Sequence, residues 1–414
     1  MKRNGREFTP RARPVQKIEL SENYIKPRGI LALLCLILGI ALMGYGLMSA
    51  LDTEPTWQQI EASSNDPHCG QDFQLMYDFT GAGGSANTQE KALTNLYSQA
   101  AVTGYRLFSP EYLEEGFGNV AWLNAHVNET VTLEPGLYKA LAQVVASGDR
   151  QVFLAPAAEQ YRHVFTAVTD QEAAEFDPAK NPQVGQWFSS LAAYVSDPAA
   201  VSVVLSGENQ AMLSVSEEYL AFARENEITR FLDFGWMTNA FLADFLADTL
   251  TESGFTKGYL TSNDGFTRNL DSNGQEYYVN LMAGQGTILV SPGQMVCKAP
   301  ASLVTLRRFS LETGDSYTYA TGETVTAYLD PADCRSKAAA ESLLAYSAQA
   351  GCGELLLQVT GLYTAESLDT QALAALREVG TYTLWCQEGT VFYNDPSLKL
   401  DLRKDGSYTA SFVN

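Results

Sequence analysis

The chain has 414 residues and a formal net charge of −21 at pH 7. This acidity argues against nucleic acid and anionic membrane surfaces as binding partners. Three scattered histidines and six cysteines without a C-x-x-C pair argue against a zinc or iron–sulfur centre and against a Ser-His-Asp triad.

The N-terminal region combines a basic tail with an uncharged apolar segment. Residues 1–28 carry a net charge of +5, which leaves −26 for the rest of the chain, and residues 29–51 contain no charged side chain. About 20 apolar residues span a bilayer as a helix, and basic flanks stay on the cytoplasmic side. The sequence therefore predicts a cytoplasmic tail, a single-pass transmembrane signal anchor in the cell membrane, and a large extracytoplasmic domain.

Two questions stay open for this topology. A cleaved signal peptide is the alternative to an anchor at 29–51, but the long basic tail and the absence of an A-x-A site favour the anchor. Outside the cell, the cysteines beyond the anchor could form one or two disulfides or remain isolated buried thiols. These cysteines are Cys69, Cys297, Cys334, Cys352 and Cys386.

The first half of the domain reads as a mixture of helices and strands. Polar residues 52–70 predict a linker that tethers the domain to the membrane. Apolar spacing and turn residues then predict a strand at 73–80, helices at 88–105, 135–148 and 181–195, and strands at 201–205 and 211–215. Ser216 is expected to cap a further helix that ends near residue 226.

Residues 228–270 form the most informative stretch. Their pattern predicts a strand, a tight glycine turn, an amphipathic helix, a second strand and a polar Asp-Gly turn. Further strands are expected at 276–281, 287–291, 302–309, 316–320, 324–329, 382–386, 390–393 and 407–412, with alanine-rich helices at 336–350 and 370–379. Helices interleaved with hairpin-like strands favour an α+β fold.

In the central stretch, Asp233 and Gly235 end the first predicted strand as D-x-G, and Asp244 lies in the helix that follows. Asp264-Gly265 then forms the polar turn. This order resembles the ApbE family of FAD:protein FMN transferases, in which D-x-G precedes a helix beginning A-K-G-Y-x-A-D and a glycine turn. The resemblance extends over about residues 71–395 and implies an ApbE-like, T-fold-related domain at 71–414.

The resemblance also implies which residues bind cofactors. Asn124 stands at the asparagine of an "LN" pair in the family, and Asp330-Pro331 keeps the end of an H-I-x-D-P strand. A flavin (FAD or FMN) is expected to contact Asn124, Asp233, Gly235, Asn239, Asp244, Asp264 and Gly265. The Mg²⁺ motif of the family aligns with residues 361–368, which makes Thr364 one candidate metal ligand. Glu366, or Asp369 as an alternative, is the other candidate if the register of the motif is shifted.

Several positions depart from the family pattern. Asn239 stands where the family has a helix-start Lys, and Asp264 replaces a glycine that lets the backbone approach the cofactor. Leu368 occupies a metal-ligand position but has no oxygen. The family's histidine has become Thr326 or Ala327. Losing the Lys and both metal ligands would lower the rate on the order of 10³-fold or more.

Compensation would have to come from other basic residues. The nearest candidates in the sequence are Lys257, Arg268, Arg307 and Arg308. Without such compensation, two functions are expected. The chain is either an extracytoplasmic FAD:protein FMN transferase of impaired activity, which acts on a Thr or Ser of an acceptor protein, or a pseudoenzyme. The pseudoenzyme would be a non-catalytic flavin-binding or partner-binding module. An unrelated anchored sensory or binding domain is the third possibility.

Overall fold

The computed structural model describes residues 57–63, 70–82, 85–271, 274–285, 288–298, 301–308 and 315–414. These residues belong to one compact unit, Pro55–Asn414. The tail predicted at 1–28 and the anchor predicted at 29–51 lie outside them. No helix within the described ranges has the length and apolar character that a membrane span requires.

A large sheet dominates the described part of the chain. It has nine strands in the order β1-β2-β6-β7-β12-β17-β18-β19-β21, and every neighbouring pair is antiparallel except β19 and β21. Their bounds are β1 Trp57–Ile60, β2 Phe73–Asp78, β6 Gly258–Ser262, β7 Phe266–Asn269, β12 Ser302–Arg307, β17 Ser342–Ser347, β18 Thr381–Gln387, β19 Thr390–Tyr393 and β21 Thr409–Phe412.

Smaller sheets and hairpins surround it. One three-stranded sheet joins β8 Glu276–Asn280, β11 Gly293–Lys298 and β20 Lys399–Leu402, and another joins β3 Thr130–Thr132, β4 Val201–Ser206 and β5 Gln210–Val215. The hairpins pair β9 Ala283–Gln285 with β10 Ile288–Val290, β13 Ser316–Thr318 with β14 Thr324–Thr326, and β15 Leu329–Asp330 with β16 Arg335–Ser336.

The helices fall into two groups along the chain. The first runs from α2 Ala86–Phe108 through α3 Val120–Ala125, α4 Pro135–Ser147, η3 Gln151–Phe153, α5 Ala155–Phe165, α6 Asp170–Phe176, α7 Pro182–Val195 and α8 Glu217–Glu225. The second comprises η4 Gly235–Met237, α9 Thr238–Glu252, α10 Cys352–Tyr363, α11 Thr370–Ala375 and η5 Leu376–Val379.

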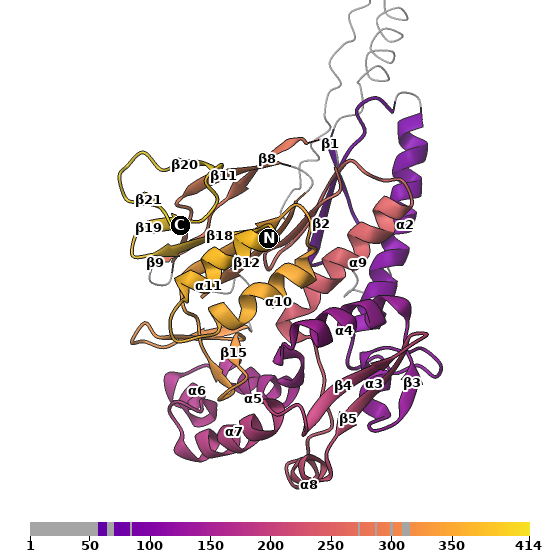
Figure 1. The fold of residues 1–414 in the computed structure, drawn as a ribbon, viewed down its shortest axis with the longest axis vertical. Helices are drawn as coiled ribbons and strands as arrows, with labels where there is room; N and C mark the ends of the chain where they lie inside the picture. Colours follow the sequence, from indigo (N-terminus) through magenta and orange to yellow (C-terminus); the bar gives the residue numbers. More distant parts are fainter. Residues whose placement is uncertain are drawn as a thin grey trace, which may run out of the picture. The chain divides into compact units, whose positions relative to one another are not determined.

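The two faces of the nine-stranded sheet have different covers. Helices α2, α9 and α10 lie over one face, with α5, α6 and α7 gathered beyond its end (Figure 1). The main apolar core, which includes Leu75, Phe266 and Val304, fills the space under these helices. A second core, which includes Leu303 and Met295, lies on the opposite face against β8, β11 and β20.

Local capping explains why many predicted elements form. The Asn181 side chain accepts hydrogen bonds from two amides at the start of α7, and the Ser216 hydroxyl accepts one from Tyr219 in α8. Gly148 ends α4 in the left-handed conformation, with φ of 70°, which glycine adopts without strain. These residue choices confirm the predicted bounds of the three helices to within a few residues.

The strand predicted at 228–233 is wrong, because this segment has no strand partner in the described residues. Its backbone groups are satisfied in another way. The Asn124 carboxamide accepts hydrogen bonds from the Phe231 and Leu232 amides at 2.9 and 3.1 Å and donates to the Leu232 carbonyl at 2.7 Å. One side chain thus substitutes for a neighbouring strand.

The alanine-rich helix predicted at 336–350 is also wrong. Residues 342–347 form β17, a strand that pairs with β12 on one side and β18 on the other and is buried along its whole length. A strand that is buried on both faces can be apolar at successive positions, so it shows no alternation of polar and apolar residues. Pairing with two neighbouring strands overrides the helical propensity of alanine. Part of the predicted 52–70 linker is strand as well, since β1 pairs with β2.

Candidate functional site

Four of the predicted cofactor-binding residues line one cleft of about 750 Å³. They are Asp233, Gly235, Asn239 and Asp264. The cleft lies where the 228–234 segment, the start of α9 and the β6–β7 turn meet the end of α2 and helix α5. Its size is in the range of sites that hold small ligands. The remaining predicted residues lie elsewhere, as described below.

At the start of α9, Asn239 is bonded to the residue that replaces the expected glycine. Its carboxamide nitrogen donates to the Asp264 carboxylate at 2.9 Å, and the Ser262 hydroxyl donates to the other carboxylate oxygen. Burial of this carboxyl raises the pKa of Asp264 to about 6, although both hydrogen bonds favour the charged form. The two departures from the family pattern therefore form one pair.

A second cluster surrounds Asp233. One carboxylate oxygen accepts a hydrogen bond from the Gly235 amide at 2.9 Å, and burial raises the pKa of Asp233 above its ordinary value. The Arg230 guanidinium lies 3.7 Å from Asp233, 3.4 Å from Glu111 and 3.7 Å from Glu159. Gly235 has a φ of 52°, a left-handed conformation that a glycine adopts freely.

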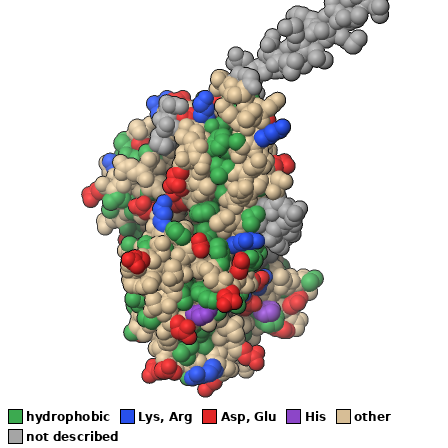
Figure 2. Space-filling view, turned by 90° about the vertical axis from the view of Figure 1, so that its right-hand side faces the viewer, with side chains coloured by type: hydrophobic (Ala, Val, Ile, Leu, Met, Phe, Trp, Pro, Cys, Tyr) green, Lys and Arg blue, Asp and Glu red, His purple; other side chains and the backbone are tan. Residues whose placement is uncertain are grey.

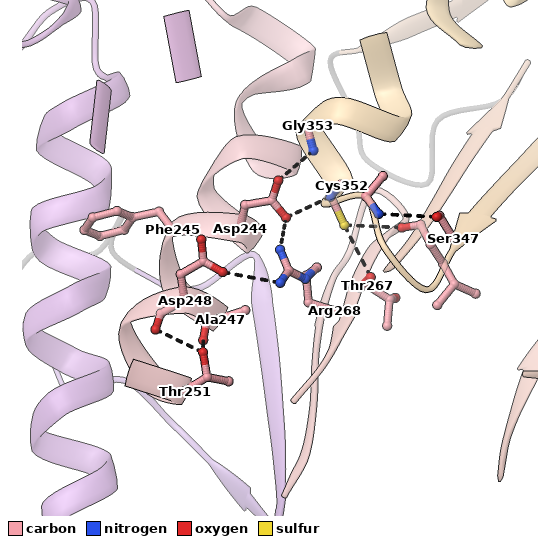
Figure 3. Close-up of polar contacts among 12 residues, drawn as sticks. Asp244, Phe245, Ala247, Asp248, Thr251, Thr267, Arg268, Ser347, Cys352 and Gly353 are labelled. Carbon is pink, nitrogen blue, oxygen red and sulfur yellow. Dashed lines mark hydrogen bonds and ion pairs between the residues drawn. The ribbon is translucent and has the colours of Figure 1, made fainter. Parts of the chain in front are cut away.

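Asp244 does not line this cleft, and its carboxylate joins α9 to α10 and β7 (Figure 3). Its carboxylate accepts hydrogen bonds from the Cys352 and Gly353 amides, at 2.8 and 2.9 Å, at the start of α10. The Arg268 guanidinium of β7 pairs with the same carboxylate and lies 3.3 Å from Asp248. An acidic group at a helix N-terminus satisfies amides that have no partner within the helix.

Asn124 and Gly265 also have contacts outside the cleft. Asn124 is engaged with the 228–234 segment, as described above. Gly265 has a φ of 112° in the β6–β7 turn, and a Cβ atom there would lie 2.8 Å from the Thr305 carbonyl oxygen of β12. The Thr305 amide also donates to the Gly265 carbonyl at 2.9 Å. The glycine is thus required for close packing of the turn on β12.

The structure does not bring Thr364 and Glu366 together as metal ligands. The Thr364 hydroxyl is buried at the end of α10 and donates to the Thr360 carbonyl at 3.0 Å. The Glu366 side chain is 85% exposed and lies 3.3 Å from the Lys337 ammonium. A buried hydroxyl that bonds its own helix and an exposed carboxylate beside a lysine do not fit Mg²⁺, which prefers several convergent oxygens.

The described residues contain no other grouping of three or more His, Cys, Asp and Glu side chains suited to a metal ion. The segment assigned to the metal motif, 361–368, covers the end of α10 and the turn after it. The region at 336–350, expected as an inserted helix before this motif, contains the strand β17 instead. The Mg²⁺ expectation therefore has no donor set among the residues that the structure describes.

Of the four basic residues that could compensate, only one approaches the cleft. Arg307 borders a side pocket of about 70 Å³ that also contains Asp264, Asp315 and Trp236. Arg268 is engaged by Asp244, Lys257 donates to the Thr80 carbonyl, and Arg308 donates to the Ala338 carbonyl.

The lining of the cleft is predominantly acidic. Its described charged residues are Asp72, Glu111, Glu159, Asp233, Asp264 and Asp315 against Arg162 and Arg230. Acidic side chains are also spread over the face of the molecule drawn in Figure 2. An anionic diphosphate would meet repulsion from most of these groups at short range.

Sequence reasoning missed several lining residues. Arg230 lies only three positions before Asp233, so it could have been found from its place in the motif. Glu159 and Arg162 come from α5, which was not predicted, and Asp315 directly precedes β13, far along the chain. Trp236 also lines the cleft, with its ring 4.7 Å from that of Tyr328.

Comparison with known proteins gives a match at the level of structure alone. No family model and no curated protein matches the sequence. The ApbE protein from Thermotoga maritima superposes with a TM-score of 0.56 at 12% identity, covering 84% of this chain and 97% of its own. The flavin transferase ApbE from Vibrio cholerae superposes with a TM-score of 0.51, again at 12% identity, covering 84% of this chain and 98% of its own.

A mutant of the Vibrio cholerae protein gives the same TM-score, 0.51. At 12% identity these matches concern the fold and not the activity. They confirm the predicted α+β architecture and the ApbE-like fold that the resemblance implied. Across 84% of its length, the chain has the fold of the ApbE flavin transferases.

Proposed function

We propose that this protein is a membrane-anchored, extracytoplasmic relative of the FAD:protein FMN transferases in which transfer is strongly impaired. In the reaction implied by the fold, a Thr or Ser hydroxyl of an acceptor protein attacks the FMN phosphorus of FAD. The pyrophosphate bond breaks, AMP leaves, and the hydroxyl proton is lost to a base. The protein's own part would be to bind the flavin nucleotide and orient its phosphates.

The Asn239–Asp264 hydrogen bond carries this proposal. It places a neutral amide and a carboxyl in the cleft where the resemblance implies a Lys and a glycine. A lysine would attract the phosphates and stabilise charge in the transition state, whereas a carboxylate repels them. Nucleotide binding is weakened and the transition state is stabilised less, so the transfer rate falls below that of a protein with the same fold and the family's Lys and glycine.

The placement of the two candidate metal ligands favours a second function. Thr364 is committed to its own helix, and Glu366 is exposed beside Lys337. If Mg²⁺ is not held, the same cleft would serve a non-catalytic flavin-binding or partner-binding module. The difference between the two functions is a measurable transfer of FMN.

The test uses the full chain in detergent with FAD, Mg²⁺ and a flavinylation-acceptor domain. Mass spectrometry measures the covalent FMN on the acceptor. We expect it to form on the order of 10³-fold more slowly than with an active transferase. The double variant Asn239→Lys with Asp264→Gly should increase the rate or the affinity for FAD at least about tenfold. Asn95→Lys, on the exposed side of α2, adds the same charge away from the cleft and should change neither.

The outcomes separate the two functions. Flavin bound without transfer, in the wild type and in the double variant, would identify a binding module. Absence of both flavin binding and AMP release would rule out both flavin functions. A wild-type rate equal to that of an active transferase would contradict impairment by the Asn239–Asp264 pair.

A further inference from the structure

A second cavity, of about 580 Å³, lies on the face of the nine-stranded sheet opposite helices α2, α9 and α10. Along β7, Arg268 points to α9, so Thr267 and Asn269 face the other side because side chains alternate along a strand. Both residues line this cavity, as do Leu303 of β12 and, from the facing sheet, Tyr277 of β8. We refer to it as the sheet-face pocket.

Its walls present aromatic rings. Trp57 of β1, Tyr259 of β6 and Tyr277 of β8 have ring centroids 5.7 to 6.2 Å apart, with the Tyr277 ring nearly perpendicular to the other two. All three side chains are partly exposed, so their rings are accessible as well as packed against one another. Rings of this kind favour planar partners, which stack on one face or pack edge to face.

One polar group in the pocket has no partner. Asn269 is only 9% exposed, and its carboxamide oxygen is buried without a hydrogen bond in the described residues. Leaving such an oxygen unsatisfied costs about 1–3 kcal/mol. Asn269 lies directly opposite Tyr259 in the β6–β7 pairing, so the amide adjoins an aromatic ring. A small rotation about the terminal torsion, which is soft, would present the amide to a bound molecule.

The charge of the pocket limits the class of ligand. Of the described residues that line it, only Glu276 is charged at pH 7, and its carboxylate lies 3.4 Å from the Lys399 ammonium. The cleft, in contrast, is lined by six acidic and two basic described residues. An uncharged molecule is therefore preferred over a phosphate or a carboxylate, because the described lining residues include no basic side chain to balance either anion.

We propose that the sheet-face pocket binds an uncharged planar heteroaromatic ring bearing a lactam or imide edge. The ring packs against Trp57 and Tyr259, and its N–H and C=O groups pair with the carbonyl and amide of Asn269. This two-bond pairing matches the donor and acceptor of a carboxamide. The site is separate from the cleft and does not depend on the function proposed for it.

Theobromine and caffeine provide a matched pair of probes. Both are uncharged purinediones, and they differ at one ring nitrogen, which carries hydrogen in theobromine and methyl in caffeine. Isothermal titration calorimetry of the full chain in detergent should give at least about tenfold tighter binding of theobromine. Asn269→Ala should remove this preference, while Asn95→Ala, at an exposed position of α2, should keep it.

Thermal unfolding of each variant checks that the fold is kept. If Asn269→Ala is unstable, Trp57→Leu offers a second variant, because the loss of a stacking surface at the sheet edge should weaken both probes equally. The proposal is overturned if the wild type binds neither probe at millimolar concentration or binds both equally. It is also overturned if the preference survives in Asn269→Ala and is lost in Trp236→Ala, which would place binding in the cleft.

Discussion

At the scale of single residues, two aspartates of the central stretch have different roles. Asp264 sits in the cleft with a raised pKa, whereas Asp244 is held by two amides and an arginine. Sequence comparison treats one as a departure from the family pattern and the other as a match. The structure shows that the matching residue supports the scaffold, while the departing residue places a carboxyl in the cleft.

Asp264 should make stability depend on pH. Its pKa of about 6 in the folded protein exceeds the ordinary value of 3.8, so the folded state binds more protons between these values. Stability contributed by this carboxyl is present at low pH and is lost as the pH rises through the range from about 4 to 6. Relative to Asp264→Asn, the wild type should lose on the order of 1 kcal/mol of unfolding free energy between pH 4 and pH 7.

Urea denaturation at the two pH values measures this difference, and the comparison with Asp264→Asn cancels groups that titrate elsewhere. Asp405→Asn is a suitable control, since its carboxyl lies on the surface and its pKa is lowered by hydrogen bonds from Ser407. A gap between the wild type and Asp264→Asn that does not change with pH would contradict a raised pKa for Asp264.

At the scale of elements, polar side chains replace secondary structure at two junctions. Asn124 supplies the hydrogen bonds that a neighbouring strand would give to residues 231–232. Asp244 joins α9 to the N-terminus of α10 and, through Arg268, to β7 (Figure 3). Both residues fall in segments that the resemblance assigned to flavin binding, and both have an architectural role in this chain.

Removing the Asp244 carboxylate should destabilise the domain strongly. Asp244→Ala leaves the Arg268 guanidinium and two α10 amides without this partner in a largely buried place, which should cost about 3–5 kcal/mol. Asp248→Ala removes the longer contact of the same arginine and the ion pair with the exposed Lys139, and should cost less than about 1 kcal/mol.

Denaturant unfolding followed by circular dichroism measures both variants. Asp244→Asn, which keeps an acceptor oxygen but removes the charge, should fall between them. Equal losses for Asp244→Ala and Asp248→Ala would contradict the junction role assigned to Asp244.

At the scale of the whole molecule, the charge division along the chain predicts its orientation. Residues 1–28 carry +5 and the remainder carries −26, so a helix at 29–51 should keep the N-terminus in the cytoplasm. A C-terminal alkaline phosphatase fusion should therefore be active, because that enzyme requires an oxidising exterior to form its disulfides. Reversing the charge of five basic residues in the tail should reduce this activity, because it removes the positive charge that holds the tail in the cytoplasm.

The fold was predictable in outline because its signals are local. Caps such as Asn181, Ser216 and Gly148 and the apolar spacing of α2 and α9 identify elements from their own residues. The predictions that were wrong concern segments whose secondary structure depends on residues far away in the sequence. Residues 342–347 are a strand because β12 and β18 flank them, and 228–233 is not a strand because Asn124 satisfies its backbone.

The sequence by itself determined the α+β class, the order of most elements, the acidic character and the relation to the ApbE fold. Only the tertiary structure decided which predicted residues share a cleft. Asn239 and Asp264 are 25 positions apart and meet because α9 packs beside the β6–β7 turn. Thr364 and Glu366 are two positions apart and do not converge, because one is buried in its helix and the other faces solvent. Proximity in space depends on packing between elements, and spacing along the chain does not encode it.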